Sequence, residues 1–370
     1  MDERQHLVVD LGPDRSYPIV FAPLSFVGAS LTQAMGGNAH KCVLVSNDVV
    51  GPLYRAKVES SLNEAGWTVA HCEIKDGEAE KTPETALKLV MDVLDTQPDR
   101  HTPIVALGGG VTTDIAGFAA STVLRGLPFI NIPTSLLAMV DASVGGKTGV
   151  NTRHGKNLWG AFWQPRCVHI AVEALATLDD AELRCGLGEV VKHAVLGPDN
   201  DDFFSWLETN ASRIVAREDD ALVRAVRECC AAKAAIVSAD ERESGKRALL
   251  NLGHTVGHAI ERVVGYGGLR HGEAVAIGTI AETHLAVVRG VADASLVKRI
   301  EALVKAVGLP TRAAGLSGDE LAAAVFSDKK MEGKSIKVTI PHAIGDVRLE
   351  MIFPEELRPA FLYLDAKEEA

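Results

Sequence analysis

The sequence predicts an α/β domain with a parallel sheet over residues 1–179 and an all-α domain over residues 180–370. The 370 residues are enough for two hydrophobic cores and too many for one typical domain. Strand-like apolar runs alternate with helical patterns in the first half, and helical periodicity replaces the strand signals after about residue 178. No low-complexity linker separates the two parts, so we expect the two domains to meet across a cleft.

The first half has the order of segments expected for parallel strands joined by crossover helices. It opens with a predicted hairpin, "HLVVDLG…SYPIVFA". Strands are then predicted at 41–47, 68–74, 102–110 and 128–133, and helices at 52–66, 82–95, 112–121 and 134–140.

The second half is predicted to consist of helices, with one exception. The exception is a small hairpin over residues 335–352, "SIKVTIPHAIGDVRLEMI". Helical periodicity is found at 179–196, 221–240, 254–265, 272–290 and 294–308.

The composition excludes several classes of protein. The net charge is −11 and no long block of like charge is present, so a main role in binding nucleic acid is not expected. The six cysteines show no C-x-x-C spacing and "MDERQHLVVD" lacks the apolar core of a signal peptide, which favours the cytoplasm. Apolar runs such as "LLAMV" fall far short of the roughly 20 residues that cross a bilayer.

Two glycine-rich loops suggest a phosphate-bearing ligand. Gly108–Gly110 lie between a predicted strand and a helix, where backbone N–H groups favour a phosphate, although Thr113 replaces the last glycine of the dinucleotide fingerprint. A tight turn is the alternative explanation. In the second loop, "DASVGGKTGVN", Asp141 replaces the first glycine of a nucleoside-triphosphate loop. Lys147, Arg125, Lys156 and Asn157 nevertheless provide donors for a smaller phosphate.

Three histidines predict a divalent metal site. His254 and His258 are spaced i, i+4 on one helical face, and His271 opens the next helix. Glu189, on the helix that also carries Lys192 and His193, offers a carboxylate to complete the site. Arg247 and Asn251 share a predicted helical face with His254, at i, i+4 and i+7. Further cations are either ligand contacts or solvated surface groups: Lys233, Lys329 and Lys330.

Taken together, seven motifs resemble the 3-dehydroquinate synthase family, in the same order from about residue 42 to 345. They are "GGGVTTDIAGFAAS", "RGLPFINIPTSLLAMVDASVGGKTGVN", "GKNLWGAFWQP", "GLGEVVKHAVL", "LLNLGHTVGHAIE", "YGGLRHGEAVAIG" and "DKKMEGKSIKVTIP". The resemblance implies a nucleotide-binding α/β domain and a helical domain. It also implies NAD and one divalent metal, zinc or alternatively cobalt, in the cleft between them, and a homodimer.

The resemblance also implies roles for individual residues. His258 is assigned to substrate, which overrules the interpretation of His254 and His258 as a metal-binding pair. Many members carry a second threonine where Ser135 stands, and serine keeps the hydroxyl. The implied metal ligands are Glu189, His254 and His271; the NAD contacts are Asp76, Gly77, Glu78, Lys81, Gly109, Gly110, Asp114, Thr134 and Ser135; the catalytic residues are Asp141, Lys192, Asn251 and His258; and the remaining substrate contacts are Arg125, Lys147, Lys156, Asn157, Lys233, Arg247 and either Lys329 or Lys330.

The implied activity is a carbon–oxygen lyase reaction of the shikimate pathway. 3-Deoxy-D-arabino-heptulosonate 7-phosphate is transiently oxidised by NAD at C5, loses phosphate, is reduced again, opens and closes to 3-dehydroquinate. The alternatives are a related cyclase acting on sedoheptulose 7-phosphate or on an amino analogue, a metal-dependent polyol dehydrogenase, and a binding protein without activity. Arg247 and Lys156 favour a substrate with a carboxylate, which sedoheptulose 7-phosphate lacks.

Overall fold

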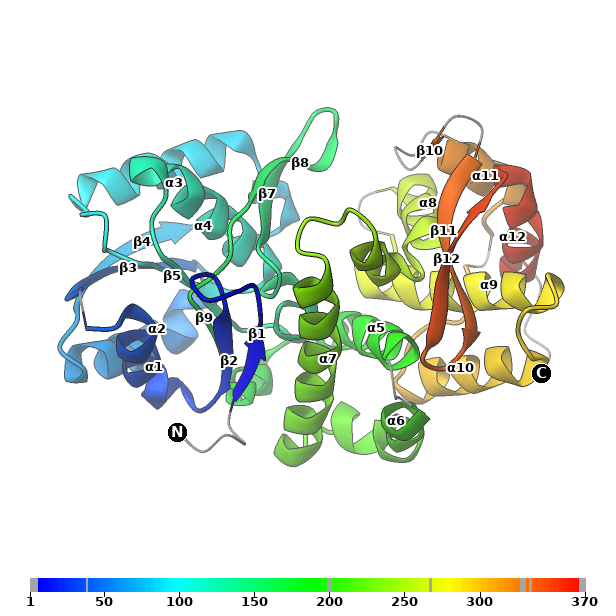
Figure 1. The fold of residues 1–370 in the computed structure, drawn as a ribbon, viewed down its shortest axis with the longest axis horizontal. Coiled ribbons are helices and arrows are strands. Elements are labelled where there is room, and N and C mark those ends of the chain that lie inside the picture. The colour runs from blue at the N-terminus through cyan, green and yellow to red at the C-terminus, as the bar shows by residue number, and fades with distance from the viewer. Residues whose placement is uncertain are drawn as a thin grey trace. The chain divides into compact units, whose positions relative to one another are not determined.

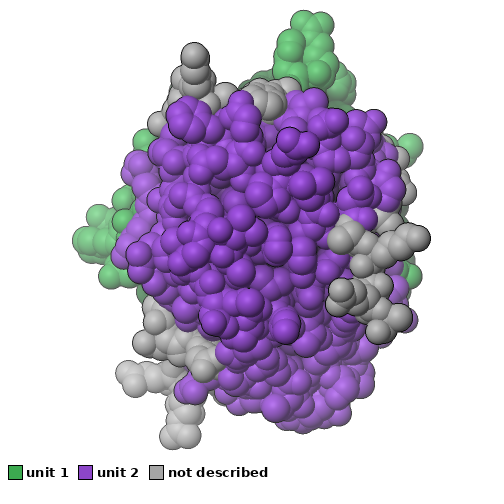
Figure 2. Space-filling view, turned by 90° about the vertical axis from the view of Figure 1, so that its right-hand side faces the viewer, with its two compact units in different colours: residues 1–179, 233–242 green, residues 180–232, 243–370 purple. Residues whose placement is uncertain are grey.

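The computed structural model divides into two compact units, coloured separately in Figure 2. Unit 1 comprises Met1–Asp179 and Lys233–Arg242, and unit 2 comprises Asp180–Ala232 and Glu243–Ala370. The structure describes residues 6–37, 39–197, 201–265, 268–313, 315–326, 331–332 and 335–365.

Residues 233–242 belong to unit 1, although they lie within the predicted helical domain of residues 180–370. They form the end of helix α7 (Asp219–Ala239) and the turn after it. Hydrogen bonds tie them to unit 1: the Asp10 N–H donates to Ser238 Oγ at 2.9 Å, and Arg15 donates to Glu241 at 2.5 Å. Helical periodicity identifies α7 as a helix but does not reveal which core each of its turns joins.

Unit 1 is built on a seven-stranded, mostly parallel sheet, shown in blue to green in Figure 1. Only the β1–β2 pair is antiparallel, as expected for the predicted hairpin, and every other neighbouring pair runs parallel. The order across the sheet is β1 (His6–Val9), β2 (Tyr17–Phe21), β9 (Cys167–Ile170), β6 (Phe129–Pro133), β5 (Ile104–Gly108), β3 (Lys41–Asn47) and β4 (Thr68–Ile74).

Helices cover both faces of this sheet. Alternate residues of β3 point in opposite directions: Val43 and Val45 pack with α3 (Pro83–Asp95) and α4 (Gly110–Thr122), while Leu44 packs with α1 (Val27–Met35) and α2 (Gly51–Glu64). Strands buried on both faces carry continuous apolar runs, and in β3 this run is Cys42–Val45. The sheet therefore forms the middle of three layers.

A second, two-stranded sheet in unit 1 was not predicted. Strands β7 (Lys147–Thr152) and β8 (Gly155–Phe162) pair antiparallel, and β7 packs against α4. Most of β8 is exposed, so its sequence lacks the apolar alternation typical of a half-buried strand. The predicted helix at 134–140 is a short helical turn that continues as the π-helix η5 (Ala138–Ala142).

Unit 2 is mainly helical. The label all-α is too simple, because the predicted hairpin is present and a short third strand extends it into a three-stranded antiparallel sheet. Its elements are α5 (Asp180–Leu196), α6 (Asp201–Val215), the first part of α7, α8 (His254–Val264), α9 (His271–Val288), α10 (Ala294–Ala306), α11 (Gly318–Phe326), β10 (Met331–Glu332), β11 (Ser335–Ala343), β12 (Asp346–Ile352) and α12 (Arg358–Asp365).

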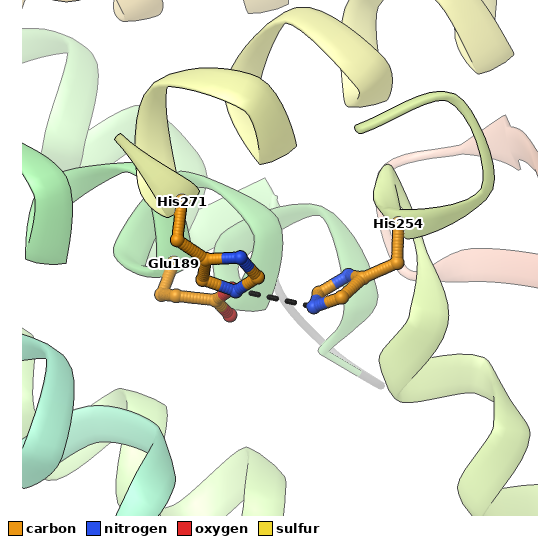
Figure 3. A group of neighbouring side chains, drawn as sticks. All are labelled: Glu189, His254 and His271. Atoms are coloured by element: carbon orange, nitrogen blue, oxygen red, sulfur yellow. Dashed lines mark ion pairs between the residues drawn. The ribbon is translucent and has the colours of Figure 1, made fainter. Parts of the chain in front are cut away.

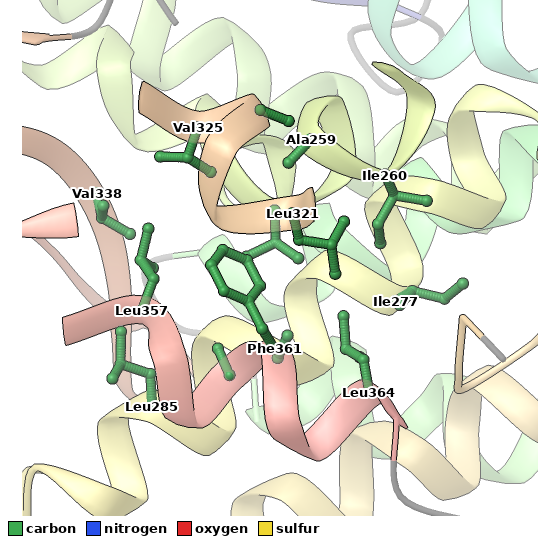
Figure 4. Close-up of a cluster of buried hydrophobic side chains, with 14 of the residues drawn as sticks. Ala259, Ile260, Ile277, Leu285, Leu321, Val325, Val338, Leu357, Phe361 and Leu364 are labelled. Carbon is green, nitrogen blue, oxygen red and sulfur yellow. The ribbon is translucent and has the colours of Figure 1, made fainter. Parts of the chain in front are cut away.

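Helix α9 lies at the centre of unit 2. Its apolar residues Ile277 and Leu285 join a core that also receives Leu321 from α11, Val338 from β11 and Phe361 from α12 (Figure 4). Since α9 is covered on several sides, it is apolar over most of its circumference.

The short helical turns of the described chain connect these elements. They are η2 (Leu24–Phe26), η3 (Glu78–Glu80), η4 (Val123–Arg125), η6 (Val172–Thr177), η7 (Lys246–Asn251) and η8 (Pro354–Leu357). None of the described helices has the length and apolarity that a membrane span requires. All six cysteines are buried as free thiols.

Candidate active site

Glu189, His254 and His271 form a group of potential metal ligands in unit 2. One ligand atom of each lies within 4.8 Å of the others. Glu189 Oε1 is 3.6 Å from His254 Nε2 and 3.4 Å from His271 Nε2. Figure 3 shows the three side chains approaching one another from α5, α8 and α9. The carboxylate is fully buried, whereas about a third of the His271 side chain is exposed (32%), so the group is accessible from one side.

In each imidazole, Nδ1 contacts an oxygen on the far side and Nε2 faces Glu189. His254 Nδ1 lies 3.0 Å from the Leu252 carbonyl, which only accepts, so Nδ1 carries the proton and Nε2 is left with a lone pair. His271 Nδ1 lies 3.5 Å from Glu261 Oε1. Two imidazole nitrogens and one carboxylate that converge, with partners on the opposite ring nitrogens, fit a divalent cation such as zinc.

The pKa values of His254 and His271 shift in opposite directions. Burial lowers the pKa of His254 well below its ordinary value, and the nearby Lys192 ammonium lowers it further. Burial also disfavours protonated His271, but the hydrogen bonds to Glu189 and Glu261 outweigh it and raise that pKa to about 9. Lys192 is itself 1% exposed and forms an ion pair with Glu189.

His258 does not join His254 in a common ligand group. Its ring centroid is 5.3 Å from that of His254 and 6.2 Å from that of His271. Among the described residues, no group of three potential ligands within 4.8 Å contains both His254 and His258, whereas one contains His258, Glu261 and His271. The i, i+4 spacing alone therefore does not place the two imidazoles in one ligand group.

Close helix crossings bring the ligands together. A Cβ on Gly272 would lie 1.7 Å from the Cys185 carbonyl oxygen, and one on Gly188 would lie 2.1 Å from the Gly272 carbonyl oxygen. Only glycine allows α5 and α9 to approach so closely at these positions. Gly188 directly precedes Glu189, and Gly272 directly follows His271. The close crossing at these glycines therefore brings the two side chains together.

In unit 1, the first glycine loop lies where parallel strands end. Gly109 precedes α4, and the Thr134 N–H donates to the Gly108 carbonyl at 3.0 Å, which joins the ends of β5 and β6. A Cβ on Gly109 would lie 3.4 Å from Ser135 Oγ. Gly109, Gly110, Thr134 and Ser135 are thus neighbours at the carboxyl edge of the sheet, the usual position for a nucleotide in open α/β folds.

Lys81, Asp114 and Asn157 form a second polar cluster in unit 1. Lys81 Nζ lies 2.6 Å from Asp114 Oδ2 and 2.6 Å from Asn157 Oδ1. Burial raises the pKa of Asp114 despite the opposing charge of Lys81. The family resemblance implies that Lys81 and Asp114 contact NAD and that Asn157 contacts substrate, and the Lys81 ammonium joins the three side chains.

The segment that follows β4, residues 76–78, adds two acidic side chains that accept hydrogen bonds from asparagines. Asn47 donates to Asp76 Oδ1 at 2.6 Å, and Asn151 donates to Glu78 Oε1 at 2.7 Å. Neither asparagine was singled out in the sequence. Gly77 between the two acids has φ 107°, a conformation that favours glycine.

The lysine loop leads into a strand rather than a helix. Gly145 and Gly146 have φ values of 94° and 67°, and Lys147 then begins β7 with an exposed side chain. Asp141 accepts from Lys233 Nζ at 2.6 Å, which connects the first residue of this loop to α7.

The remaining predicted residues occupy separate positions. Arg125 and Lys156 are exposed in unit 1. In unit 2, His193 and Arg247 are buried, and Asn251 donates to Glu243 at 3.1 Å. Lys329 and Lys330 lie outside the described residues.

Comparisons with known proteins match this architecture along the chain. The 3-dehydroquinate synthase N-terminal model matches residues 71–185, and the 3-dehydroquinate synthase C-terminal model matches residues 186–331. The 3-dehydroquinate synthase of Desulforamulus reducens is 46% identical over 342 residues, covering 92% of this chain and 94% of that protein. The chain belongs to the 3-dehydroquinate synthase family. The enzyme of Geobacter metallireducens is likewise 46% identical, over 92% of this chain and 93% of that protein.

Solved structures of other cyclases share the fold of this family member. 2-epi-5-epi-Valiolone synthase from Streptomyces hygroscopicus, with NAD+ and Zn²⁺ bound, has a TM-score of 0.85 at 29% identity, covering 96% of this chain and 98% of that one. A 2-deoxy-scyllo-inosose synthase complexed with carbaglucose-6-phosphate, NAD+ and Co²⁺ also has a TM-score of 0.85, at 24% identity, covering 96% and 99%. The fold is therefore that of the sugar-phosphate cyclases.

Proposed function

We propose that this family member converts 3-deoxy-D-arabino-heptulosonate 7-phosphate to 3-dehydroquinate and phosphate, using NAD and one zinc ion. The convergence of Glu189, His254 and His271 carries the proposal, because this donor set fits a cation in a chain whose relatives are 3-dehydroquinate synthases. The NAD+ and Zn²⁺ recorded for the valiolone synthase, 29% identical to this chain, support the choice of cofactors.

The two kinds of cofactor residue lie in different units. The candidate NAD residues belong to unit 1, where Gly109 and Gly110 present the start of α4 and Lys81 holds Asp114. The candidate metal ligands belong to unit 2. When bound, NAD+ accepts and returns a hydride at C5 of the substrate, and the divalent cation polarises substrate oxygens.

Arginine, lysine and asparagine side chains would bind the phosphate and the carboxylate of the substrate. Arginine binds a carboxylate or phosphate through two parallel N–H donors, and lysine acts as a compact positive charge. The proposed anion-binding residues are Arg125, Lys147, Lys156, Asn157, Lys233, Arg247 and either Lys329 or Lys330.

The remaining polar residues would orient hydroxyl groups and hold protons. Lys192 can donate from its ammonium beside Glu189, and Asp141, bonded to Lys233, can accept from a substrate hydroxyl. His258 and Asn251 complete this set. No base of the protein need be assigned for the loss of phosphate, since the leaving phosphate dianion can take up the C–H proton itself.

The substrate distinguishes this proposal from the related cyclase. Sedoheptulose 7-phosphate carries a phosphate but no carboxylate. A site with enough cations to bind a phosphate and a carboxylate therefore favours the heptulosonate phosphate. A polyol dehydrogenase would release NADH at each turnover, whereas the proposed reaction returns the hydride. We further propose that the enzyme is a cytoplasmic homodimer, on the family resemblance and the free thiols.

The decisive test supplies the two sugar phosphates separately to enzyme with zinc and substoichiometric NAD. We expect many turnovers per NAD with the heptulosonate only, giving phosphate and 3-dehydroquinate. Turnover with sedoheptulose 7-phosphate only would overturn the substrate assignment, and NADH release equal to product would indicate a dehydrogenase. The His271→Ala variant should lose both zinc and activity, while His101→Ala, at an exposed turn of unit 1, should retain both.

A further inference from the structure

Helix α8, which carries His254, has no capping side chain of its own. Its first four N–H groups have no partner within the helix, as at every helix start. The residue at the cap position is Gly253, with φ 76°. A Cβ there would lie 2.4 Å from Thr279 Oγ1 and 2.5 Å from the Val275 carbonyl oxygen, so a serine, aspartate or asparagine cap does not fit.

Glu282 of α9 supplies the missing acceptors. Its Oε2 accepts from the Gly253 N–H at 2.6 Å, and its Oε1 accepts from the N–H groups of Thr255 and Val256 at 3.2 and 3.3 Å. The side chain is fully buried. A buried carboxyl group is costly unless it is hydrogen-bonded, and the positive end of a helix dipole is a favourable place for it.

The hydrogen-bonded segment includes the metal-ligand candidate itself. His254 lies between Gly253 and Thr255, and its Nδ1 donates to the Leu252 carbonyl just before them. The position of His254 Nε2 relative to Glu189 therefore depends on how the backbone of residues 252–256 is held. Glu282 holds that backbone at three N–H groups.

We propose that Glu282 is a positioning residue for the Glu189–His254–His271 group. Through its cap on α8, it fixes the direction of the His254 imidazole without contacting a cation. Helix α9 then contributes to the site in two ways. Its first residue is His271, and its Glu282 restrains the start of α8, which carries His254. This inference rests on the metal site of the proposed function. Groups that orient metal ligands typically contribute a factor of 10 to 100 in metal affinity.

The test measures Co²⁺ binding to the metal-free full-length protein by competition with a chelator, together with the visible absorption spectrum of the bound ion. Glu282→Gln keeps the size of the side chain but replaces one acceptor oxygen with an NH₂ group, which cannot accept. We expect about a 10- to 100-fold higher Kd for Co²⁺ and an altered ligand-field spectrum.

Leu285→Ala is the matched control. Leu285 lies one turn further along α9, is 1% exposed and packs in the apolar core rather than against the start of α8. This variant loses stability through a cavity. It should lower Tm at least as much as Glu282→Gln while leaving the Co²⁺ affinity and spectrum unchanged.

Three results would count against the proposal or its basis. An unchanged Co²⁺ affinity and spectrum in Glu282→Gln would overturn the positioning role. An equal loss of affinity in Leu285→Ala would also overturn it, because general destabilisation would then explain the effect. Absence of Co²⁺ binding to the unaltered protein would instead overturn the metal site of the proposed function. If Glu282→Gln does not fold, Glu282→Asp, whose carboxylate is one methylene shorter, is judged by the same criteria.

Discussion

The Lys81 ammonium nitrogen lies 2.6 Å from Asp114 Oδ2, and both side chains are largely buried, with 6% and 17% of their surface exposed. Removing one member of a buried ion pair leaves the other charge without compensation. Lys81→Met should therefore lower the free energy of unfolding by about 3 kcal/mol, measured by urea denaturation.

A matched control for this substitution is Lys88→Met. Lys88 pairs with Asp92 on the surface of α3, with 68% of its side chain exposed. Such pairs are worth at most about 1 kcal/mol. Equal losses in the two variants would show that the Lys81–Asp114 pair behaves like a surface contact.

Asp114→Ala should weaken NAD binding. Asp114 lies in the first turns of α4, which begins at the glycine loop, and it also holds Lys81 in place. We expect at least about a tenfold higher Kd for NAD+, or roughly 1.4 kcal/mol, by calorimetric titration. Asp92→Ala on α3 serves as the control, and unchanged affinity in Asp114→Ala would remove this residue from the cofactor site.

Gly272→Ala should separate α5 from α9. The added Cβ would lie 1.7 Å from the Cys185 carbonyl, and backbone cannot give way as a flexible side chain can. We expect a loss of about 1–3 kcal/mol in stability and reduced zinc content, because Glu189 and His271 lie beside this crossing. Gly318→Ala, whose Cβ would meet Phe361 at an ordinary 3.6 Å, should change neither quantity appreciably. Full zinc content in Gly272→Ala would contradict the dependence of the site on this crossing.

His169 should make unit 1 sensitive to acid. Burial lowers its pKa to about 4, below the ordinary value of 6.5. Nε2–H donates to the Pro23 carbonyl at 3.1 Å, and Nδ1 accepts from Ser30 Oγ at 2.9 Å, so the folded state holds the neutral ring. Between pH 6.5 and 4 the unfolded chain binds a proton that the folded chain does not, and stability falls as the pH falls, by up to about 3 kcal/mol.

The measurement is the free energy of unfolding between pH 7 and pH 4. His169→Gln should flatten the pH dependence, although it lowers stability at pH 7. His101→Gln, at an exposed turn, should retain the original slope. The same slope in all three proteins would show that His169 does not cause it.

Strongly patterned segments of the fold were predictable from the sequence. Strands β3 and β4 coincide with the predicted residues 41–47 and 68–74, because each is a short segment rich in apolar residues between two helices. Strand β9 was missed, since four residues are too few to show a period. Helix α6 was missed as well, and it contains Ser, Thr and Asn, which have low helix propensity, so tertiary packing contributes more to it.

The candidate site was predictable where its residues share an element. The spacing of His254 and His258 is visible in one helix, and Glu261 follows on the same face three residues after His258. The carboxylate of Glu189 was also proposed for this site from the sequence, because its helix carries Lys192 and His193 on adjacent turns. Contacts such as Lys81 with Asn157, or Glu282 with Gly253, join residues far apart in the sequence, so no local pattern reveals them.

The buried thiols can report local unfolding of each unit separately. Cys42, Cys72 and Cys167 belong to unit 1, and Cys185, Cys229 and Cys230 belong to unit 2. Burial raises the pKa of Cys42, Cys167 and Cys185 to about 12, so these groups remain protonated and unreactive until local unfolding exposes them. Pulse labelling with an alkylating reagent, followed by peptide mass spectrometry, would therefore time the opening of each unit without any engineered probe.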